Sequence, residues 1–359
     1  MSTTLGGPPP RRIFVRGPNW VGDLVMATPA LARLRAGFAE AHITVGVRPY
    51  LKPLLSGSPF FDELLEQPRA KRLAEVRDQA RQLRERRFDL AVVLPNSLQT
   101  GLVVRLAGIP RRLGYLQGRP FTMTHGLRAE RNRGLLGRHG PRRVPKPMPH
   151  YYADLLDLLD IPAVADRPQL HVSAAEDEYV DRWMRERCVP AESPLLLLNP
   201  GASFGASKLW LGDRFAAVAR YFRDHHGMVP VFLAGPAEVD LVRGMARDAE
   251  ALDTTDPVLP LSYLKALVRR GRLLVTTDTG PRHIAVAFQV PVVCVMGPTD
   301  PRYTNYCLDE TILVRKELEC SPCHRKVCPL GHHECMQGLG VDEVVAAGDE
   351  LLARAPGAP

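Results

Sequence analysis

The chain has 359 residues, of which 45% are hydrophobic and 24% charged; this composition is typical of a folded globular protein and excludes a fibrous or disordered one. No apolar run reaches the roughly 18 residues that a membrane-spanning helix needs, and the start MSTTLGGPPPRRIFV lacks the apolar core of a secretory signal. The net charge of +8 favours an acidic partner. We therefore expect a cytoplasmic protein, with two domains because the length exceeds that of one ordinary core.

The first half of the chain alternates short apolar runs with amphipathic segments. The predicted elements are a strand at 11–17, a helix from Asp23 kinked at Pro29, a strand at 42–48, a charged helix at 69–87, a strand at 88–95 and a helix at 148–161. Continuously apolar strands that alternate with helices indicate a parallel, doubly wound sheet.

The second half repeats this alternation after a linker near 165–190. The predicted elements are strands at 194–199, 228–236, 272–280 and 290–298, and helices at 212–227, 261–271, 281–289 and 341–355. The helix at 212–227 should bury Phe215, Val218, Ala219 and Phe222 and end at Gly227. The strand at 290–298 is the last one that the pattern predicts. Two α/β halves are thus expected.

Asp23 stands where the first predicted strand leads into the first helix, after the turn GPNWVG. A carboxylate at this position has two interpretations. It can stabilise the start of the helix, or the turn can hold it over a cleft where it accepts a proton.

Polar and glycine residues follow the predicted strands of the second half, where parallel sheets bind ligands. In NPGASFGASKLW, Gly201 and Gly205 allow backbone N–H groups to approach an anion, and Lys208 adds a charge. An ordinary turn with a surface lysine explains this loop equally well. Glu238, in AGPAEVD, is placed to hold the two hydroxyls of a ribose, although a lone loop glutamate is usually solvated.

The segment TTDTGPRHIA is more specific. Thr279 is predicted to cap the helix, Gly280 lets its backbone approach a ligand closely, and Pro281 suits the first helical position, where no N–H is needed. The helix N-terminus, worth about half a positive charge, would bind a diphosphate with His283 one turn inside. Alternatively, Asp278 and Thr279 are only a capping pair. No Gly-x-Gly-x-x-Gly follows the first strand, which counts against a dinucleotide-binding dehydrogenase.

Four of the seven cysteines lie in CSPCHRKVCPLGHHEC, with three histidines among them. The spacing Cys-x2-Cys-x4-Cys-x6-Cys predicts a structural zinc site made of Cys320, Cys323, Cys328 and Cys335. Such a site would be saturated by thiolates and therefore not catalytic. An iron–sulfur cluster or reduced thiols remain alternatives.

Residues 101–150 hold ten Arg and one Lys against one acid, Glu130. This basic segment suits a phosphorylated sugar, an anionic lipid or a nucleic acid. No nucleic-acid-binding motif is present, so we expect no nucleic-acid partner.

In combination these segments resemble the ADP-heptose:lipopolysaccharide heptosyltransferases, glycosyltransferase family 9, and most closely the heptosyltransferase II branch. The motifs are GPNWVGDLVMATPAL, LPNSLQTGLVVRLAGIPRRLGY, NPGASFGASKLW and TTDTGPRHIAVAFQVPVVCVMGPTDP, in the family's order, within about residues 12–305. The resemblance implies the α/β GT-B fold, two facing Rossmann-like domains with parallel sheets and a C-terminal helix. The expected parts are a disordered lead at 1–11, an acceptor-binding domain at 12–170, a nucleotide-sugar-binding domain at 171–340 that includes the Cys-rich segment 320–335, and a helix and tail at 341–359.

The resemblance also implies the activity, namely inverting, metal-independent transfer of heptose from ADP-heptose to the Kdo-lipid A inner core of lipopolysaccharide. Asp23 matches the family's general base. The donor-binding positions implied by the matching motifs are Ser203, Lys208, Glu238, Asp278, Thr279, Gly280 and His283. Candidate acceptor contacts are Asn96, Arg111, Arg112 and Arg119. The basic segment would also hold the enzyme at the anionic inner face of the cytoplasmic membrane.

Three alternatives compete with this interpretation. The chain could use another nucleotide-sugar or acceptor, because the motifs report the ADP-sugar end better than the acceptor end. It could be a non-catalytic nucleotide-sugar-binding protein, although binding alone does not require Asp23. A zinc hydrolase is disfavoured, because four thiolates leave the metal no open position.

Overall fold

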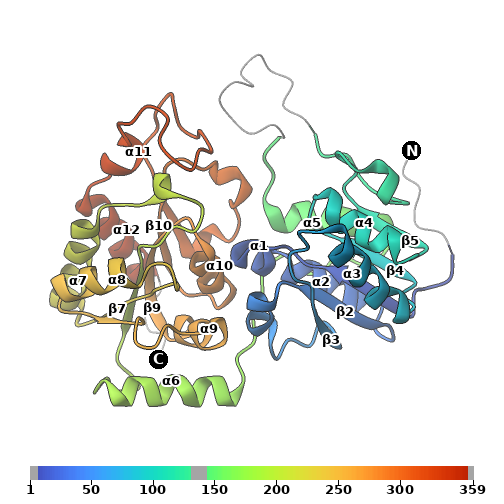
Figure 1. Ribbon diagram of the computed structural model, residues 1–359. Coiled ribbons are helices and arrows are strands. Elements are labelled where there is room, and N and C mark those ends of the chain that lie inside the picture. The colour runs from blue at the N-terminus through green and yellow to red at the C-terminus, as the bar shows by residue number, and fades with distance from the viewer. Residues whose placement is uncertain (1–6, 131–143, 355–359) are drawn as a thin grey trace. The chain divides into compact units, whose positions relative to one another are not determined.

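The computed structural model describes residues 7–130 and 144–354, which fall into two compact units (Figure 1). The first unit comprises residues 7–130 and 146–171, and the second comprises 172–354 together with 144–145. Residues 1–6 of the predicted lead and residues 131–143 of the arginine-rich segment lie outside the described residues. Within the described parts of the chain, no helix has the length and apolar character needed to cross a membrane.

The first unit is built around a five-stranded parallel sheet in the order β3-β2-β1-β4-β5. Its elements are β1 (Arg12–Arg16), α1 (Val21–Met26), α2 (Thr28–Gly37), β2 (His42–Val47), β3 (Glu63–Glu66), α3 (Leu73–Glu85), β4 (Leu90–Val93), α4 (Leu98–Leu106), β5 (Arg111–Gly114) and α5 (Met148–Leu156), with short 3-10 helices at Pro49–Leu55, Pro120–Thr122 and Asp157–Leu159.

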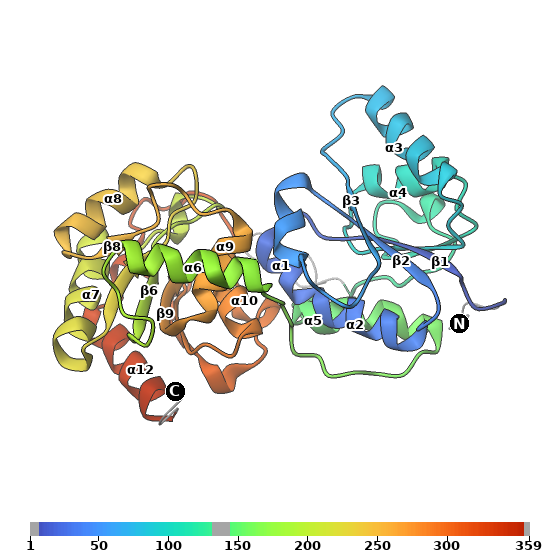
Figure 2. The ribbon, with the colours of Figure 1, turned by 90° about the horizontal axis from the view of Figure 1, so that it is seen from below.

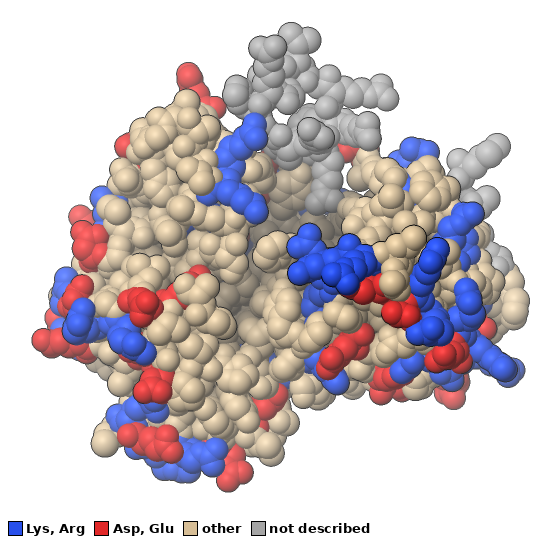
Figure 3. Space-filling view, viewed as in Figure 1, with Lys and Arg blue, Asp and Glu red and all other residues tan. Residues whose placement is uncertain are grey.

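Helices cover both faces of this sheet. Helices α2 and α5 pack together on one face, and α3 and α4 pack together on the other (Figure 2). The predicted charged helix is α3, and charges of both signs are interspersed over it (Figure 3). Its apolar positions, Val76, Ala80 and Leu83, are buried against the sheet. Helix α3 therefore holds to the core by a narrow apolar stripe.

The second unit contains a six-stranded parallel sheet in the order β11-β10-β9-β6-β7-β8. Its elements are α6 (Ala174–Glu186), β6 (Leu195–Asn199), α7 (Gly212–His226), β7 (Val229–Phe232), α8 (Val239–Asp248), β8 (Leu252–Asp253), α9 (Leu261–Arg269), β9 (Gly271–Thr277), α10 (Gly280–Ala287), β10 (Val292–Val295), β11 (Thr311–Val314), α11 (Glu334–Gln337) and α12 (Val341–Arg354), with 3-10 helices at Ala206–Lys208, Pro301–Tyr303 and Leu308–Glu310.

One face of the second sheet carries the main core. Helices α7, α8 and α12 bury their apolar sides against alternate residues of β6, β9 and β10. The residues predicted to face inward from α7 (Phe215, Val218, Ala219 and Phe222) are all fully buried, and Gly227 ends that helix in the left-handed conformation. Helices α9 and α10 also pack on β9, and α6 packs on α9.

The predicted elements correspond well to the observed ones, with two kinds of difference. The first helix is broken rather than kinked: α1 ends at Met26, and Pro29 lies in the first turn of α2. In that turn the backbone N–H groups have no partner within the helix, so the N–H that proline lacks costs no hydrogen bond. Several elements were not predicted, namely β3, α4, β5, α6, α8, β8, β11 and α11. Strand β11 lies at the sheet edge after the strand expected to be last.

Candidate active site

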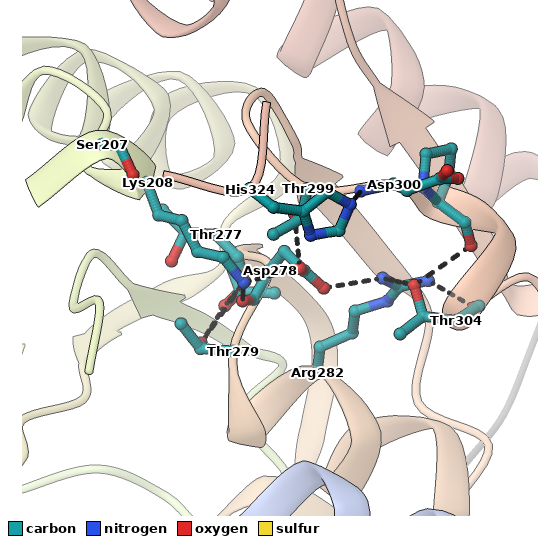
Figure 4. A network of polar contacts seen from close by, with 12 residues as sticks. Ser207, Lys208, Thr277, Asp278, Thr279, Arg282, Thr299, Asp300, Thr304 and His324 are labelled. Carbon is teal, nitrogen blue, oxygen red and sulfur yellow. Dashed lines mark hydrogen bonds and ion pairs between the residues drawn. The ribbon is translucent and has the colours of Figure 1, made fainter. Parts of the chain in front are cut away.

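The loops that follow β6, β9 and β10 meet at one edge of the second sheet. These strands are adjacent and parallel, so their carboxyl ends share that edge. The loops carry Lys208, Asp278 and Thr299 respectively, which gather into one polar cluster (Figure 4). Polar residues that follow three separate strands in the sequence thus lie together at the carboxyl edge of the sheet, where parallel sheets bind ligands.

Asp278 is the centre of the cluster. Its carboxylate accepts hydrogen bonds from Lys208 Nζ (2.7 Å), Arg282 Nη1 (3.1 Å) and Thr299 Oγ1 (2.7 Å). Burial alone would raise the pKa of Asp278, but the charges of Lys208 and Arg282 outweigh burial, and the pKa lies far below its usual range. Asp278 is therefore ionised, and it neutralises one of two buried cations.

Lys208 keeps bonding capacity for a ligand. Its ammonium, in a side chain that is 10% exposed, donates to the carboxylate and to the backbone carbonyl of Asp278, the latter also at 2.7 Å. An ammonium has three N–H donors, so one is left. Arg282 is more deeply buried, with 1% of the residue exposed, and its two terminal nitrogens donate to Asp278 and to the hydroxyl and carbonyl of Thr304. Its Nε has no hydrogen-bond partner among the described residues.

His283 lies inside the first turn of α10 as a neutral ring. Burial, assisted by the charge of Arg282, lowers the pKa of His283 to about 3. Its Nδ1 contacts the hydroxyl of Tyr306 at 2.6 Å. His283 therefore adds a polar group to this edge without adding a charge.

Thr279 occupies the N-cap position of α10, with a proline in the first turn, as predicted. Its side chain makes no capping bond, so the predicted capping role is wrong. The hydroxyl instead accepts a hydrogen bond from Asn199 Nδ2 at 2.8 Å, which ties the end of β6 to the start of α10. The N-terminus of α10, beginning at Gly280, is consequently not capped by Thr279.

Glu238 joins two loops at the same edge. Its carboxylate accepts from the backbone N–H of Ala202 (2.9 Å) and of Gly235 (3.1 Å). A Cβ on Gly201 would lie 2.1 Å from Glu238 Oε1, so a larger residue there would displace the Glu238 carboxylate. Ser203 is exposed in the loop between Gly201 and Lys208.

The four cysteines of segment 320–335 line one small pocket together with His332. Burial, with the other cysteines close by, raises the pKa of the Cys335 thiol to about 11. Among the residues that the structure describes, which include all four cysteines, no three His, Cys, Asp or Glu side chains form a group that could hold a metal ion. The structure therefore does not support the structural zinc or iron–sulfur cluster predicted from the spacing.

In the first unit, Asp23 lies in the first turn of α1 and is partly exposed. The turn before it is fixed by Arg16, whose buried guanidinium donates to Gly17 O, to Gly46 O (3.0 Å) and to Asn19 Oδ1 (2.6 Å). Burial, with the charge of Arg48 nearby, lowers the pKa of Arg16 to about 9. The backbone that carries Asp23 is thus anchored to the ends of β1 and β2.

Basic and aromatic side chains lie near this turn. The negative charge of Asp23 is among the influences that raise the pKa of Tyr50, although burial contributes more. Tyr50 is half exposed, its hydroxyl donates to Asn19 O, and it lies close to Arg48. Trp20 is 59% exposed. Neither Arg48 nor Tyr50 belongs to a recognisable motif, so the sequence did not predict them as site residues.

The four candidate acceptor residues have local partners. Arg119 is fully buried and donates to Tyr115 O, Ser97 O and Thr100 Oγ1, which is a structural arrangement and contradicts its selection as an acceptor contact. Arg112 donates to Thr122 O (2.8 Å) and to Ile109 O, and Arg111 to Pro8 O (2.8 Å). The Asn96 amide donates to Tyr151 Oη at 2.9 Å. Arg111, Arg112 and Arg119 thus donate mainly to backbone carbonyls.

Comparison with known proteins identifies the family. A family model described as glycosyltransferase family 9 (heptosyltransferase) matches residues 76–334, well over half of the chain. This chain belongs to glycosyltransferase family 9. The lipopolysaccharide heptosyltransferase 2 of Escherichia coli K12 is 30% identical to it over 361 residues, covering 95% of this chain and 98% of that one. The lipooligosaccharide heptosyltransferase 2 of Haemophilus influenzae is 26% identical, covering 95% and 99%.

Solved structures show the same fold. A family 9 glycosyltransferase from Veillonella parvula superimposes with a TM-score of 0.81 at 22% identity, covering 96% of this chain and 98% of that one. The E. coli ADP-heptose lps heptosyltransferase II gives a TM-score of 0.75 at 25% identity, covering 96% and 99%. This family 9 glycosyltransferase thus has the α/β GT-B fold, with a parallel Rossmann-like sheet in each unit.

Several residues of the polar cluster were not predicted from the sequence. Thr299 is one of them, and its hydroxyl donates directly to Asp278. Asn199 and Thr277 connect the ends of β6 and β9, the latter donating to Gly201 O at 2.6 Å. The one available indication was position, since each of these residues ends or follows a buried strand.

Proposed function

We propose that this family 9 glycosyltransferase transfers L-glycero-D-manno-heptose from ADP-heptose to the heptose/Kdo inner core of lipopolysaccharide, with inversion at the anomeric carbon. Its relatives named lipopolysaccharide or lipooligosaccharide heptosyltransferase 2 match it over nearly their whole length, which supports this substrate class. The observation that carries the proposal is the Lys208–Asp278 pair beside the start of α10, because it combines a cation with a helix N-terminus that the side chain of Thr279 does not cap.

The proposed donor site binds the diphosphate at the edge of the second sheet. The remaining N–H of Lys208 and the first N–H groups of α10 stabilise the negative charge that develops on ADP as it leaves. Lys208 and the start of α10 are thus proposed to stabilise the leaving diphosphate in the way that a bound divalent cation does in other transferases. Glu238, which already orders the loop through Ala202, is proposed to face the ribose, and Ser203 and His283 complete the site.

The proposed acceptor site lies in the first unit. The acceptor hydroxyl attacks the anomeric carbon, its proton passes to the carboxylate of Asp23, and the bond to the phosphate oxygen breaks with its electron pair remaining on ADP. Arg48, whose charge, like that of Asp23, acts on Tyr50, is proposed to bind an anionic group of the acceptor, with Asn96 a further candidate. Arg111 and Arg112 remain weaker candidates, because they also bind carbonyls.

We also propose that the protein works at the cytoplasmic face of the inner membrane as a peripheral protein. The supporting observation is the excess of Arg in residues 101–150, a segment that would attract anionic lipid. Attraction of this kind is screened by salt.

A mass-spectrometric transfer assay tests the function. The protein is incubated with ADP-heptose and a mono-heptosylated Kdo-lipid A acceptor, beside the Asp23→Asn variant. A product heavier by one heptose, absent with the variant, is the expected result. If ADP binds but no product forms with this acceptor, the substrate assignment is wrong, and other nucleotide-sugars and acceptors become the candidates. If Asp23→Asn retains full turnover, Asp23 only stabilises its helix.

A further inference from the structure

The Cys-rich segment 320–335 is part of the donor site rather than a separate knuckle. Ser207, the residue before Lys208, donates from its backbone N–H to Lys326 O (3.0 Å) and from its hydroxyl to Arg325 O (2.5 Å). Its own carbonyl contacts His333 Nε2 at 2.7 Å. The segment therefore fixes the loop that presents the lysine.

Gly205 shows how closely the segment and the loop approach. A Cβ at this position would lie 2.5 Å from Lys326 O, and the residue has φ of +155°. Any larger residue would push the loop away from the segment. The Cys-rich segment 320–335 and the loop that carries Gly205 and Lys208 therefore pack together as one surface.

His324 is the side chain of the segment that reaches the polar cluster. Its backbone N–H donates to Pro298 O (2.8 Å), and its ring Nε2 accepts from the backbone N–H of Asp300 (3.2 Å). The edge of the ring packs against Tyr303, with centroids 5.8 Å apart. These contacts fix the ring at the end of β10, and Figure 4 shows it beside Thr299, close to the Asp278 carboxylate.

The contact with Asp300 also fixes which nitrogen carries the proton. Because Nε2 accepts a hydrogen bond, the neutral ring has its proton on Nδ1. Nδ1–H is thus a donor, and it has no hydrogen-bond partner among the described residues.

We propose that His324 Nδ1 donates a hydrogen bond to the diphosphate of the bound nucleotide-sugar, so that the Cys-rich segment supplies a donor-binding residue to the transferase. This inference rests on the proposed ADP-heptose site. A neutral donor suits the position, because Lys208 and Arg282 already exceed the charge of Asp278 by one. A hydrogen bond to a charged acceptor corresponds to about 10- to 100-fold in affinity.

Two variants distinguish the hydrogen-bond donor of the His324 ring, Nδ1, from its hydrogen-bond acceptor, Nε2. In His324→Asn the amide can take the place of Nδ1, and in His324→Gln it can take the place of Nε2. We expect His324→Gln to weaken ADP binding about 10- to 100-fold in calorimetry and His324→Asn to weaken it much less. Adenosine, which has no phosphate, should bind all proteins equally and reports that the site is folded. His225→Gln, at the exposed end of α7, is the matched control.

The outcomes discriminate between the possible roles. Unchanged ADP affinity in His324→Gln overturns the inference while leaving the proposed function intact. Equal losses in both variants, or a parallel loss of adenosine binding, mean that His324 only positions the loop, which also overturns it. If the unmodified protein does not bind ADP, the proposed donor site itself is wrong and the inference falls with it.

Discussion

Replacing Asp278 by asparagine tests whether the buried ionic cluster has the role assigned to it. The substitution keeps the shape of the side chain but removes the one negative charge that faces Lys208 and Arg282, whose side chains are 10% and 2% exposed. Removing one partner of a buried pair leaves an uncompensated charge and costs about 3–5 kcal/mol. We therefore expect the free energy of unfolding to fall by about that amount at pH 7.

The stabilisation by Asp278 should depend on pH, and its pKa shift predicts in which direction. The pKa of Asp278 is depressed in the folded protein, so its contribution is present above the ordinary pKa of 3.8 and is lost as the pH falls below it. His283, whose pKa falls to about 3, acts in the same direction, since the unfolded chain takes up its proton below about 6.5. The stability difference between the unmodified protein and Asp278→Asn should accordingly narrow below pH 4.

Urea unfolding followed by fluorescence measures this difference, with Asp224→Asn as the control. Asp224 forms an exposed pair with Arg223 in α7, and its side chain is 56% exposed, so its loss should change stability by no more than about 1 kcal/mol. If Asp278→Asn proves as stable as Asp224→Asn at pH 7, the cluster does not depend on charge pairing and the reasoning is refuted.

Three further predictions follow from the two units. Asp23→Asn should lower kcat by about 10²- to 10⁴-fold while the Kd for ADP, measured by calorimetry, stays the same; a parallel loss of ADP binding would contradict a base acting on the acceptor. Gly201→Ala should displace Glu238, because the new Cβ would lie 2.1 Å from its carboxylate, and should weaken ADP binding more than the exposed substitution Ala237→Ser does; equal affinities would show that the loop adapts freely. Binding to anionic vesicles, measured by sedimentation, should fall steeply between low and high salt, and binding that is insensitive to salt would exclude attraction by the arginine-rich segment.

The sequence alone determined the fold class of this glycosyltransferase. Long, continuously apolar strands such as β6 and strongly periodic helices such as α7 appear in the local pattern, because burial on both faces or on one stripe dictates which residues are apolar. Short or polar elements such as β8 and β11 could not be predicted this way, since edge strands are specified by their neighbours rather than by their own composition.

The sequence also selected Lys208 and Asp278, the residues of the proposed donor site, through loops that follow buried strands. It did not reveal that these two side chains pair, because they are 70 positions apart and meet only through the order of β6 and β9. The same limit explains why Arg119 was mistaken for an acceptor contact: the sequence gives its charge, whereas only packing shows that its donors bind carbonyls. The sequence supplied the chemical groups, and the tertiary structure decided which of them are neutralised, buried or left with a hydrogen bond to give.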